Sequence, residues 1–486
     1  MLAILGHCFH IVRVCRILGL VGGYGLGFFF SWVSILSFCL LIFSDCEADF
    51  KRLEARPLTD RGEGANGTAN GVANGSASTS RGSASTSHGP AVSSKSAVST
   101  GLDAKAITTH SRQNHDLKLA PGKTVSGTIT SKPYQLQWQS YPTDLGHRLE
   151  WVLDLVTTFR GLNWNFRSST FPKLEPVDKV NSRRSLQQIQ RQALLNLVYS
   201  YLAIDVMKAL HAEDEFFSGV ISFYDPPSSA IYGADVTVSR LARLSITILS
   251  VYAALSFLFQ LSPIFFSIIL PSLIPYPSLL SLTRTPLLTP SVYEPFFGPL
   301  LPSVVSKGIA GFWGSFWHSL LRFGILHPSA YLIKRYRLDP ASTTSRTIQV
   351  LTAFCLSGVI HGLGSYTSFP PVPDSNHPLS KTFFFFLMQG IGIIVQGYAT
   401  RAIGSRSFPP MVRQTGNLLF TVIFLLLTAP ILAEDTARCG AWLFEPLPVS
   451  LVRGVRGQGW WRWNGRWCGW WKDPDGRWWE SGYGVY

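Results

Sequence analysis

Charged residues are scarce in this sequence. Lys, Arg, Asp and Glu make up only 14% of its 486 residues, whereas a soluble domain carries about 25%. Phe alone contributes 32 residues, and 46% of the chain is hydrophobic. This composition argues against a soluble enzyme and excludes a wholly disordered chain.

Cysteine clusters and common catalytic motifs are also missing. The seven Cys are scattered without a CxxC pair, which excludes a disulfide scaffold and a zinc module. No HExxH is present, so we expect no bound metal. No GxSxG is present either, and Cys355 falls nearly opposite His361 on one expected helix, which disfavours nucleophilic Ser or Cys chemistry.

Long uncharged runs are what the sequence has instead. Residues 17–43 contain no charge, exceed the length of a signal peptide and precede a poor cleavage site at Asp45-Cys46-Glu47. Further candidate spans are 244–283 (two spans broken by prolines), 347–366, 382–400 and 414–433, with weaker candidates at 192–210 and 308–326. We therefore predict an all-α, polytopic membrane helical bundle with about seven to nine transmembrane helices.

The chain divides into four expected parts. They are an N-terminal transmembrane helix (1–48), a flexible, disordered low-complexity linker (49–135), a membrane domain (136–456) and a Trp-rich interfacial tail (457–486). The linker repeats ANG three times and SASTS twice, a composition that cannot bury an apolar core. Basic residues around the first span place this linker in the cytoplasm, where the sequons at Asn66 and Asn74 would stay unglycosylated.

The net charge of +14 has two interpretations. Basic residues form no single stripe, so membrane topology and anionic head groups explain them better than nucleic-acid binding. The tail holds eight of the fifteen Trp within 460–479, interleaved with four basic residues. Because Trp and Arg both favour the head-group layer, we expect an interfacial segment rather than a nucleic-acid or carbohydrate reader.

Two segments of the membrane domain call for separate expectations. Residues 145–164 place Leu149, Leu153 and Val156 at helical spacing, which predicts an amphipathic helix on the membrane surface, ended by Gly161. Asp205 lies in an apolar helix and fits two interpretations equally: placement near the helix end, or a polar contact inside the bundle.

Two of the eleven histidines lie in apolar surroundings. His361 is in a run without formal charge, beside Ser357, Gly358, Gly362 and Gly364, which would leave space around the ring or let another helix come close. Ionisable groups at membrane depth are usually functional, so acid/base chemistry is favoured over an interhelical hydrogen bond. For His318 both remain open, because Trp313, Trp317 and Arg322 around it could form an interface belt.

These two segments resemble a known family. FWGSFWHSLLR (312–322) and SGVIHG (357–362) are similar to the wax synthase-like branch of membrane-bound O-acyltransferases. Further matching pieces are DFKRLE (49–54), WVLDLVTTFRGLNW (151–164), Asp205, EPFFG (294–298) and WLFEPLPVSLVRG (442–454). Family members often carry basic residues where this chain has Ala310 and Ser315, so we expect any hold on the coenzyme A phosphates to fall on other residues, for example Lys307 or Arg322.

The resemblance implies transfer of an acyl group from acyl-CoA to a hydroxyl. It assigns catalysis to His361 with His318 as a second active-site residue, and we expect Lys307, Arg322, Trp313 and Trp317 to contact acyl-CoA. The linker and tail resemble fungal enzymes that acetylate terpenoid or meroterpenoid secondary metabolites with acetyl-CoA, in a multi-pass protein of the endoplasmic reticulum. Alternatives are a long-chain wax-ester or sterol-ester synthase and, in another class, a multi-span transporter, although no internal repeat supports the latter.

Overall fold

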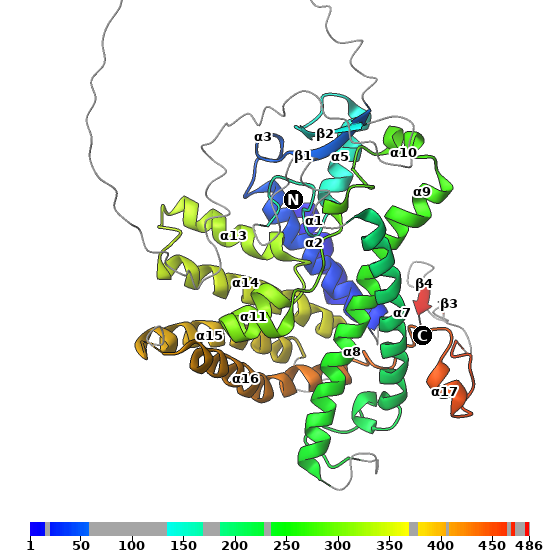
Figure 1. Cartoon of the computed structure of the whole chain (residues 1–486), viewed down its shortest axis with the longest axis vertical. Coiled ribbons are helices and arrows are strands. Elements are labelled where there is room, and N and C mark those ends of the chain that lie inside the picture. Colours follow the sequence, from blue (N-terminus) through cyan, green and yellow to red (C-terminus); the bar gives the residue numbers. More distant parts are fainter. Residues whose placement is uncertain are drawn as a thin grey trace, which may run out of the picture.

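The fold is a bundle of helices with two small two-stranded sheets (Figure 1). The computed structural model describes residues 1–14, 20–57, 134–168, 185–227, 235–368, 378–404, 408–463, 468–471 and 482–485. Its N-terminal elements are α1 (Leu2–Val14), η1 (Leu20–Tyr24), α2 (Gly25–Leu41), α3 (Cys46–Asp49), β1 (Arg52–Pro57), β2 (Tyr134–Gln139) and α5 (Leu145–Thr157).

The remaining elements belong to the body of the bundle and the tail. The first group is α7 (Leu186–His211), η4 (Glu215–Ser218), α8 (Val236–Ile264), η6 (Phe265–Ile269), α9 (Leu270–Leu273), α10 (Tyr276–Leu282) and η7 (Pro290–Val292). The second group is α11 (Leu300–Lys307), α12 (Ile309–Gly311), η8 (Phe312–Phe316), α13 (Arg322–Arg335), α14 (Thr343–Ser368), α15 (Pro378–Ala402), α16 (Pro410–Arg438), α17 (Leu451–Val455), β3 (Cys468–Trp471) and β4 (Gly482–Val485).

Six helices of the described residues are long and apolar enough to cross a membrane. They are Gly22–Leu41, Leu186–His211, Val236–Leu273, Thr343–Ser368, Ser380–Ala402 and Pro410–Arg438, with α1 as a shorter apolar helix. The polytopic helical fold is thereby confirmed, with fewer such helices than the seven to nine that we predicted. The weak candidate 192–210 is one of the six, because α7 extends it at both ends.

Two of the expected membrane stretches do not form as we predicted. Residues 244–283 were expected to cross twice, but one continuous run from α8 through η6 to α9 occupies most of this stretch. Pro263 lies inside α8, and the π-helical turn η6 directly follows, so the chain continues helically instead of reversing. Residues 308–326 are likewise no single helix: Trp317 adopts an extended backbone (ψ 153°) after η8, and α13 starts only at Arg322.

The linker expected over 49–135 is ordered at both ends, which corrects its boundaries. β1 pairs antiparallel with β2, from Arg52 opposite Gln139 to Pro57 opposite Tyr134. The two ends of the intervening chain therefore lie together (Figure 1). Asn66 and Asn74 lie outside the described residues.

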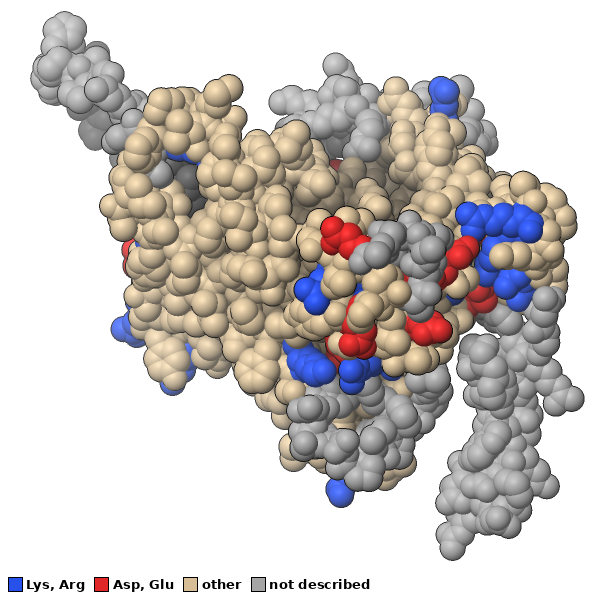
Figure 2. All heavy atoms as spheres, turned by 90° about the horizontal axis from the view of Figure 1, so that it is seen from below, with Lys and Arg blue, Asp and Glu red and all other residues tan. Residues whose placement is uncertain are grey.

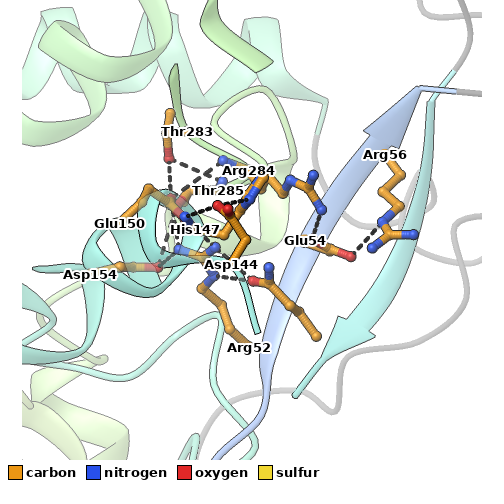
Figure 3. A network of polar contacts seen from close by, with 11 residues as sticks. Arg52, Glu54, Arg56, Asp144, His147, Glu150, Asp154, Thr283, Arg284 and Thr285 are labelled. Atoms are coloured by element: carbon orange, nitrogen blue, oxygen red, sulfur yellow. Dashed lines mark hydrogen bonds and ion pairs between the residues drawn. The ribbon is translucent and has the colours of Figure 1, made fainter. Parts of the chain in front are cut away.

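A buried arginine holds this sheet to α5. Arg52 is fully buried; its Nη1 donates to Glu150 Oε1 (2.7 Å) and Asp154 Oδ2 (3.1 Å), and its Nη2 also pairs with Glu150. Figure 3 shows Arg52 with Glu150 and Asp154. The strand partner Gln139 accepts from the Nε and Nη2 of Arg52. Burial disfavours the ionised Glu150, but the hydrogen bonds and charge of Arg52 outweigh it and lower the pKa of that carboxyl.

The amphipathic segment starts as expected and ends early. Asp144 caps α5 by accepting from the His147 backbone N–H (3.1 Å). The helix ends at Thr157 rather than at Gly161, which instead has a left-handed backbone (φ 58°) in the following turn. The Leu149, Leu153 and Val156 side chains are all exposed, so the apolar stripe faces outward; its position on a membrane surface stays a prediction.

Asp205 makes a polar contact inside the bundle, which decides between its two interpretations. Only 1% of it is exposed, and it accepts hydrogen bonds from the backbone N–H groups of Leu451 (2.7 Å) and Val452 (2.9 Å) and from Ser450. These are the first groups of α17, so the carboxylate caps that helix and fastens the C-terminal segment to α7.

The outward faces of the long helices carry large apolar side chains. Examples are Val198 on α7, Leu258 on α8, Val395 on α15 and Leu427 on α16, each more than half exposed. Figure 2 shows the molecule from below, where most of the visible acidic and basic side chains gather at the centre and right of the described surface and the left part carries only a few, near its edge. In the tail, Trp460 and Trp461 are exposed, while the interfacial role of the segment stays a prediction.

We predict that Arg52→Ala destabilises the protein by about 3–5 kcal/mol, because it leaves two carboxylates without their partner. Arg52→Lys should restore part of the loss, since an ammonium keeps the charge but not the planar fork. Thermal unfolding in detergent measures the effect. The matched control is Arg56→Ala: Arg56 is exposed, and its buried partner Glu54 keeps Arg284 and Gln137 as partners, so the loss should be less than about 1 kcal/mol. Equal losses in both variants would contradict the central role of Arg52.

Candidate active site

His361 lies on α14 at the meeting point of three helical elements. Its Nδ1 is 2.7 Å from the hydroxyl of Tyr24, which belongs to η1. Its ring stacks on Phe386 of α15 with centroids 4.6 Å apart and an angle of 10°, and Phe28 of α2 contacts it edge-on at 5.3 Å. The imidazole is half-buried, and among the described residues Tyr24 is its hydrogen-bond partner.

Small residues beside His361 let these elements come close. A Cβ on Gly358 would lie 3.0 Å from the Phe383 ring of α15, and one on Gly364 would lie 3.0 Å from the Tyr24 carbonyl oxygen. Of the two roles expected for them, these two glycines therefore serve helix approach rather than open space around the ring. The close approach brings Tyr24 of η1 and Phe386 of α15, two elements that both pack on α14, against the imidazole of His361.

His318 occupies the irregular segment between η8 and α13. Its ring contacts Trp317 (5.4 Å), Phe259 (5.8 Å) and Phe297 (6.2 Å), so its surroundings are aromatic. The Nδ1 atom is buried and has no hydrogen-bond partner among the described residues. Burial lowers the pKa of His318 to about 3, so its imidazole is neutral at physiological pH.

A continuous row of aromatic rings joins the two histidines. From His361 it passes through Phe386 to Trp313 (6.0 Å), then to Trp317 (5.8 Å) and on to His318 (5.4 Å). The two imidazoles are also within electrostatic range, because a charge on His361 would further lower the pKa of His318. Residues 43 positions apart in sequence thus share one apolar, aromatic environment.

Arg160 holds the segment that packs on His318. Its guanidinium donates to the carbonyl oxygens of Glu294 (2.7 Å) and Pro295 (2.7 Å) and to the Ser319 hydroxyl (3.2 Å). It also lies over the Phe296 ring at 4.1 Å. The side chain of Arg160 thereby connects two of the segments that resemble the acyltransferase family, 151–164 and 294–298, with the segment that holds His318.

The four residues expected to contact acyl-CoA lie in different surroundings. Trp313 donates from Nε1 to Gln389 Oε1 (3.2 Å), and Trp317 packs between it and His318. Arg322 is half-buried and donates to the Gly314 carbonyl oxygen (3.2 Å). Lys307 is exposed at the end of α11. Three of these residues therefore share the His318 segment, while Lys307 offers its ammonium to the surface.

Sequence reasoning missed three residues around His361: Tyr24, Phe386 and Asp435. Tyr24 and Phe386 are inconspicuous in apolar runs, and nothing in the sequence pairs them with His361. Asp435 lies just beyond the span predicted at 414–433, yet it is buried, with 3% of its surface exposed. An acid directly after an uncharged run was the signal that could have found it.

Metal binding has no support in the part of the chain that the structure describes. There, no group of three or more His, Cys, Asp or Glu side chains is arranged to hold an ion.

We predict that Gly298→Ala disrupts the His318 segment. A Cβ at this position would lie 2.1 Å from the Ser315 carbonyl oxygen, and the Gly298 N–H donates to the Phe316 carbonyl oxygen (2.9 Å). Because backbone atoms cannot yield cheaply, we expect a loss of folded protein of about 2 kcal/mol or more in thermal unfolding. Gly416→Ala is the control, since no atom lies within 4 Å of its new Cβ; a neutral Gly298→Ala would contradict the close approach.

Comparison with known proteins finds one family model that matches part of the chain. Residues 293–388 match the membrane bound O-acyl transferase family, a stretch that includes His318, His361 and Phe386. No solved structure matches the chain significantly.

The chain is also similar to curated fungal proteins. The acetyltransferase fsoF of Humicola fuscoatra is 33% identical over 128 residues, covering 26% of this chain and 27% of that protein. The O-mevalon transferase yanI of Aspergillus niger is 26% identical over 246 residues (49% and 50%), and the acetyltransferase eriL of Hericium erinaceus is 28% identical over 155 residues (32% and 39%). The matches thus span about a quarter to a half of these relatives. Six helices of the described residues are long and apolar enough to cross a membrane, so the chain is a multi-pass membrane protein; its segment 293–388, which holds both histidines, is similar to the membrane bound O-acyl transferase family, and the chain is distantly similar to fungal acetyltransferases and O-mevalon transferases.

Proposed function

We propose that this protein transfers an acetyl group from acetyl-CoA to a hydroxyl of a lipophilic terpenoid or meroterpenoid secondary metabolite. The observation that carries the proposal is the meeting of His361 and His318 in one aromatic, apolar environment within the region that matches the family. Relatives named acetyltransferases support acetyl as the acyl group. A membrane enzyme acting on a lipophilic alcohol fits the endoplasmic reticulum, which we include in the proposal.

His361 is the general base of this mechanism. Its unprotonated Nε2 takes the proton of the alcohol as the oxygen attacks the thioester carbonyl carbon. The tetrahedral intermediate then collapses, the C–S bond breaks, and the imidazolium returns the proton to the departing thiolate. The products are the acetate ester and the free thiol of coenzyme A, without a covalent enzyme intermediate.

His318 supports the same step from the other side of the aromatic row. As a neutral imidazole with an unpartnered Nδ1, it offers one more ring nitrogen toward the reacting groups. In the tautomer with the proton on Nδ1, this nitrogen donates a hydrogen bond to the carbonyl oxygen, where negative charge develops. The apolar rings strengthen that interaction by excluding water.

The donor contacts belong to the proposal as well. The exposed ammonium of Lys307 provides a cation for the phosphates of coenzyme A, while Trp313 and Trp317 line the way to His318. Arg322, engaged with the Gly314 carbonyl oxygen, supports the shape of this segment and contributes positive charge beside it.

A second donor has an observation in its favour. Two O-mevalon transferases, yanI of Aspergillus niger and macI of Penicillium terrestre, each match about half of this chain, which is a larger share than fsoF matches. A mevalonyl group is a hydroxylated acyl chain, so its transfer would use the same attack on a thioester. Assays should therefore offer acetyl-CoA, mevalonyl-CoA and a long-chain acyl-CoA in parallel.

We predict that wild-type microsomes acetylate members of a terpenoid alcohol panel with labelled acetyl-CoA and that His361→Ala lowers kcat by about 100-fold or more. His318→Ala should lower kcat by about tenfold or more through the lost hydrogen bond. His327→Ala is the control, because this imidazole contacts Ser44 (2.8 Å) away from the site. Full activity of His361→Ala would refute the assignment of the base.

Different results would contradict the proposed acyl donor and the proposed class of protein. Use of long-chain acyl-CoA with refusal of acetyl-CoA would replace the proposal with ester synthesis of the wax or sterol type. Solute uptake by proteoliposomes without any acyl transfer would replace it with transport.

We further predict that Lys307→Ala raises the KM for acetyl-CoA about three- to tenfold at low salt and leaves kcat unchanged, since a surface cation acts on binding of the phosphates. Lys334→Ala serves as the control, because Lys334 is also an exposed lysine but belongs to a different helix, α13. Steady-state kinetics with purified enzyme in detergent give both constants. An unchanged KM would remove Lys307 from the donor site.

A further inference from the structure

Gln389 of α15 is a buried amide whose two polar ends are both used. The residue has 0% of its surface exposed. Its Oε1 accepts a hydrogen bond from Trp313 Nε1 (3.2 Å), and its Nε2 donates to Thr428 Oγ1 (3.0 Å). An amide inside an apolar helix bundle costs free energy unless it has such partners, so the place of Gln389 calls for an explanation.

The directions of these hydrogen bonds follow from the chemical groups themselves. Because an indole nitrogen can only donate, the oxygen of the Gln389 amide faces Trp313 and its nitrogen faces Thr428. The Thr428 hydroxyl donates its own proton to the Phe424 carbonyl oxygen (2.9 Å), so its lone pairs accept from the amide. A one-way chain of hydrogen bonds therefore runs from η8 through α15 to the backbone of α16, and it fixes the amide in one orientation.

The indole that this amide holds lies in the middle of the aromatic row between the two histidines. On one side Trp313 contacts Phe386, the ring that stacks on His361. On the other side it contacts Trp317, the ring beside His318. The amide follows Phe386 by one helical turn on α15, so its hydrogen bond joins the helix that packs on one histidine to the segment that carries the other.

Ring packing alone leaves the orientation of this indole open. Phe354 (5.8 Å) and Phe385 (6.3 Å) also surround Trp313, with interplanar angles of 82° and 71°. Aromatic contacts of this kind are individually weak and tolerate more than one geometry. The indole N–H, by contrast, loses its acceptor when the ring turns over, and a buried donor without an acceptor is costly. The hydrogen bond to Gln389 therefore selects one of the orientations that the ring contacts permit.

We propose that Gln389 is a positioning residue of the acyl transfer, which holds Trp313 so that His361 and His318 keep the separation that the reaction needs. This inference rests on the proposed function, in which one imidazole removes the proton of the alcohol and the other stabilises the carbonyl oxygen under attack. Because both act in one step, a change in their separation lowers the rate of that step without weakening the binding of either substrate. An amide with a purely structural role would stabilise the fold without this selective effect on kcat.

The hydrogen bond of the Trp313 indole can be observed without any activity. In solid-state NMR of the protein in lipid, with ¹⁵N-labelled tryptophan, subtraction of the Trp313→Phe spectrum identifies one of the fifteen indole signals. We expect this signal to show a hydrogen-bonded N–H in the wild type and in Gln389→Glu, which keeps an oxygen for the indole, and a more weakly bonded N–H in Gln389→Met. A signal that Gln389→Met leaves unchanged would overturn the inference, whatever the enzyme catalyses.

Kinetics of the same variants test the effect on the reaction. Gln389→Met keeps the length of the side chain but offers no amide, and we expect kcat per folded enzyme to fall about tenfold or more while both KM values stay within about twofold. Gln389→Glu should recover most of this loss. Trp313→Phe should lower kcat as well, and adding Gln389→Met to it should cause little further loss, because both changes break one hydrogen bond. Additive losses in the double variant would overturn the coupling.

A second buried glutamine of the same helix provides the matched control. Gln396 lies two turns beyond Gln389; it accepts from the Ile309 backbone N–H (3.0 Å) and donates to Asn417 (3.1 Å), and both partners lie outside the aromatic row. Gln396→Met should lower thermal stability as Gln389→Met does but leave kcat per folded enzyme within about twofold. Equal losses of kcat in the two variants would overturn the inference in favour of a general effect of removing a buried amide. If wild-type enzyme transfers no acyl group at all, the proposed function fails, while the NMR signal still decides whether Gln389 holds the indole.

Discussion

Polar side chains inside an apolar helix bundle need partners from other helices, because neither hydrocarbon nor an apolar core offers any. The structure satisfies this constraint repeatedly. Arg243 of α8 makes a two-pronged ion pair with Asp214 (2.7 and 2.9 Å), and both side chains are fully buried. Asp205 joins α7 to α17, and Asp435 joins α14, α15 and α16. Each such contact fixes which helices are neighbours, so the polar groups specify the arrangement that apolar packing alone leaves open.

The candidate active site depends on the same contacts. His361 is positioned by Tyr24 from η1 and by Phe386 from α15, and glycines on α14 let both approach. A Cβ on Gly27 would lie 2.2 Å from the Leu363 carbonyl oxygen, so α2 and α14 are in backbone contact beside the site. Rigidity of this kind matters for acyl transfer, because two substrates have to meet one imidazole in a fixed geometry.

Outside the membrane-crossing helices, a second polar system organises the chain. Arg52 connects β1 with α5, and Arg160 connects the turn after α5 with residues 294–298 and Ser319 (Figure 3 shows the former). Arg52 thus fastens β1 to α5, and Arg160, shortly after α5, bonds Ser319, the residue next to His318. The segments that resemble the acyltransferase family are therefore structural neighbours and not separate motifs.

Much of the fold could be predicted from the sequence. The uncharged runs located five of the six long apolar helices, because exclusion of charge is a local requirement of the bilayer. One of the five was wrongly divided into two spans at its prolines. Residues 244–283 show the limit: prolines were expected to end a helix, whereas Pro263 is accommodated within α8 and η6 follows. Whether a proline breaks or only bends a helix depends on its neighbours in space, which a sequence does not display.

By itself, the sequence determined that this is a helical membrane protein with two histidines in apolar surroundings, since composition and charge distribution are properties of the chain alone. Only the tertiary structure decided that the two histidines share one aromatic environment, that Tyr24 contacts His361, and that Asp435 contacts Ser365, one turn from His361 on α14. These relations join residues as far as 337 positions apart. Their distances depend on how close α14 can approach its neighbours, and that follows from the packing of glycines and aromatic rings in three dimensions.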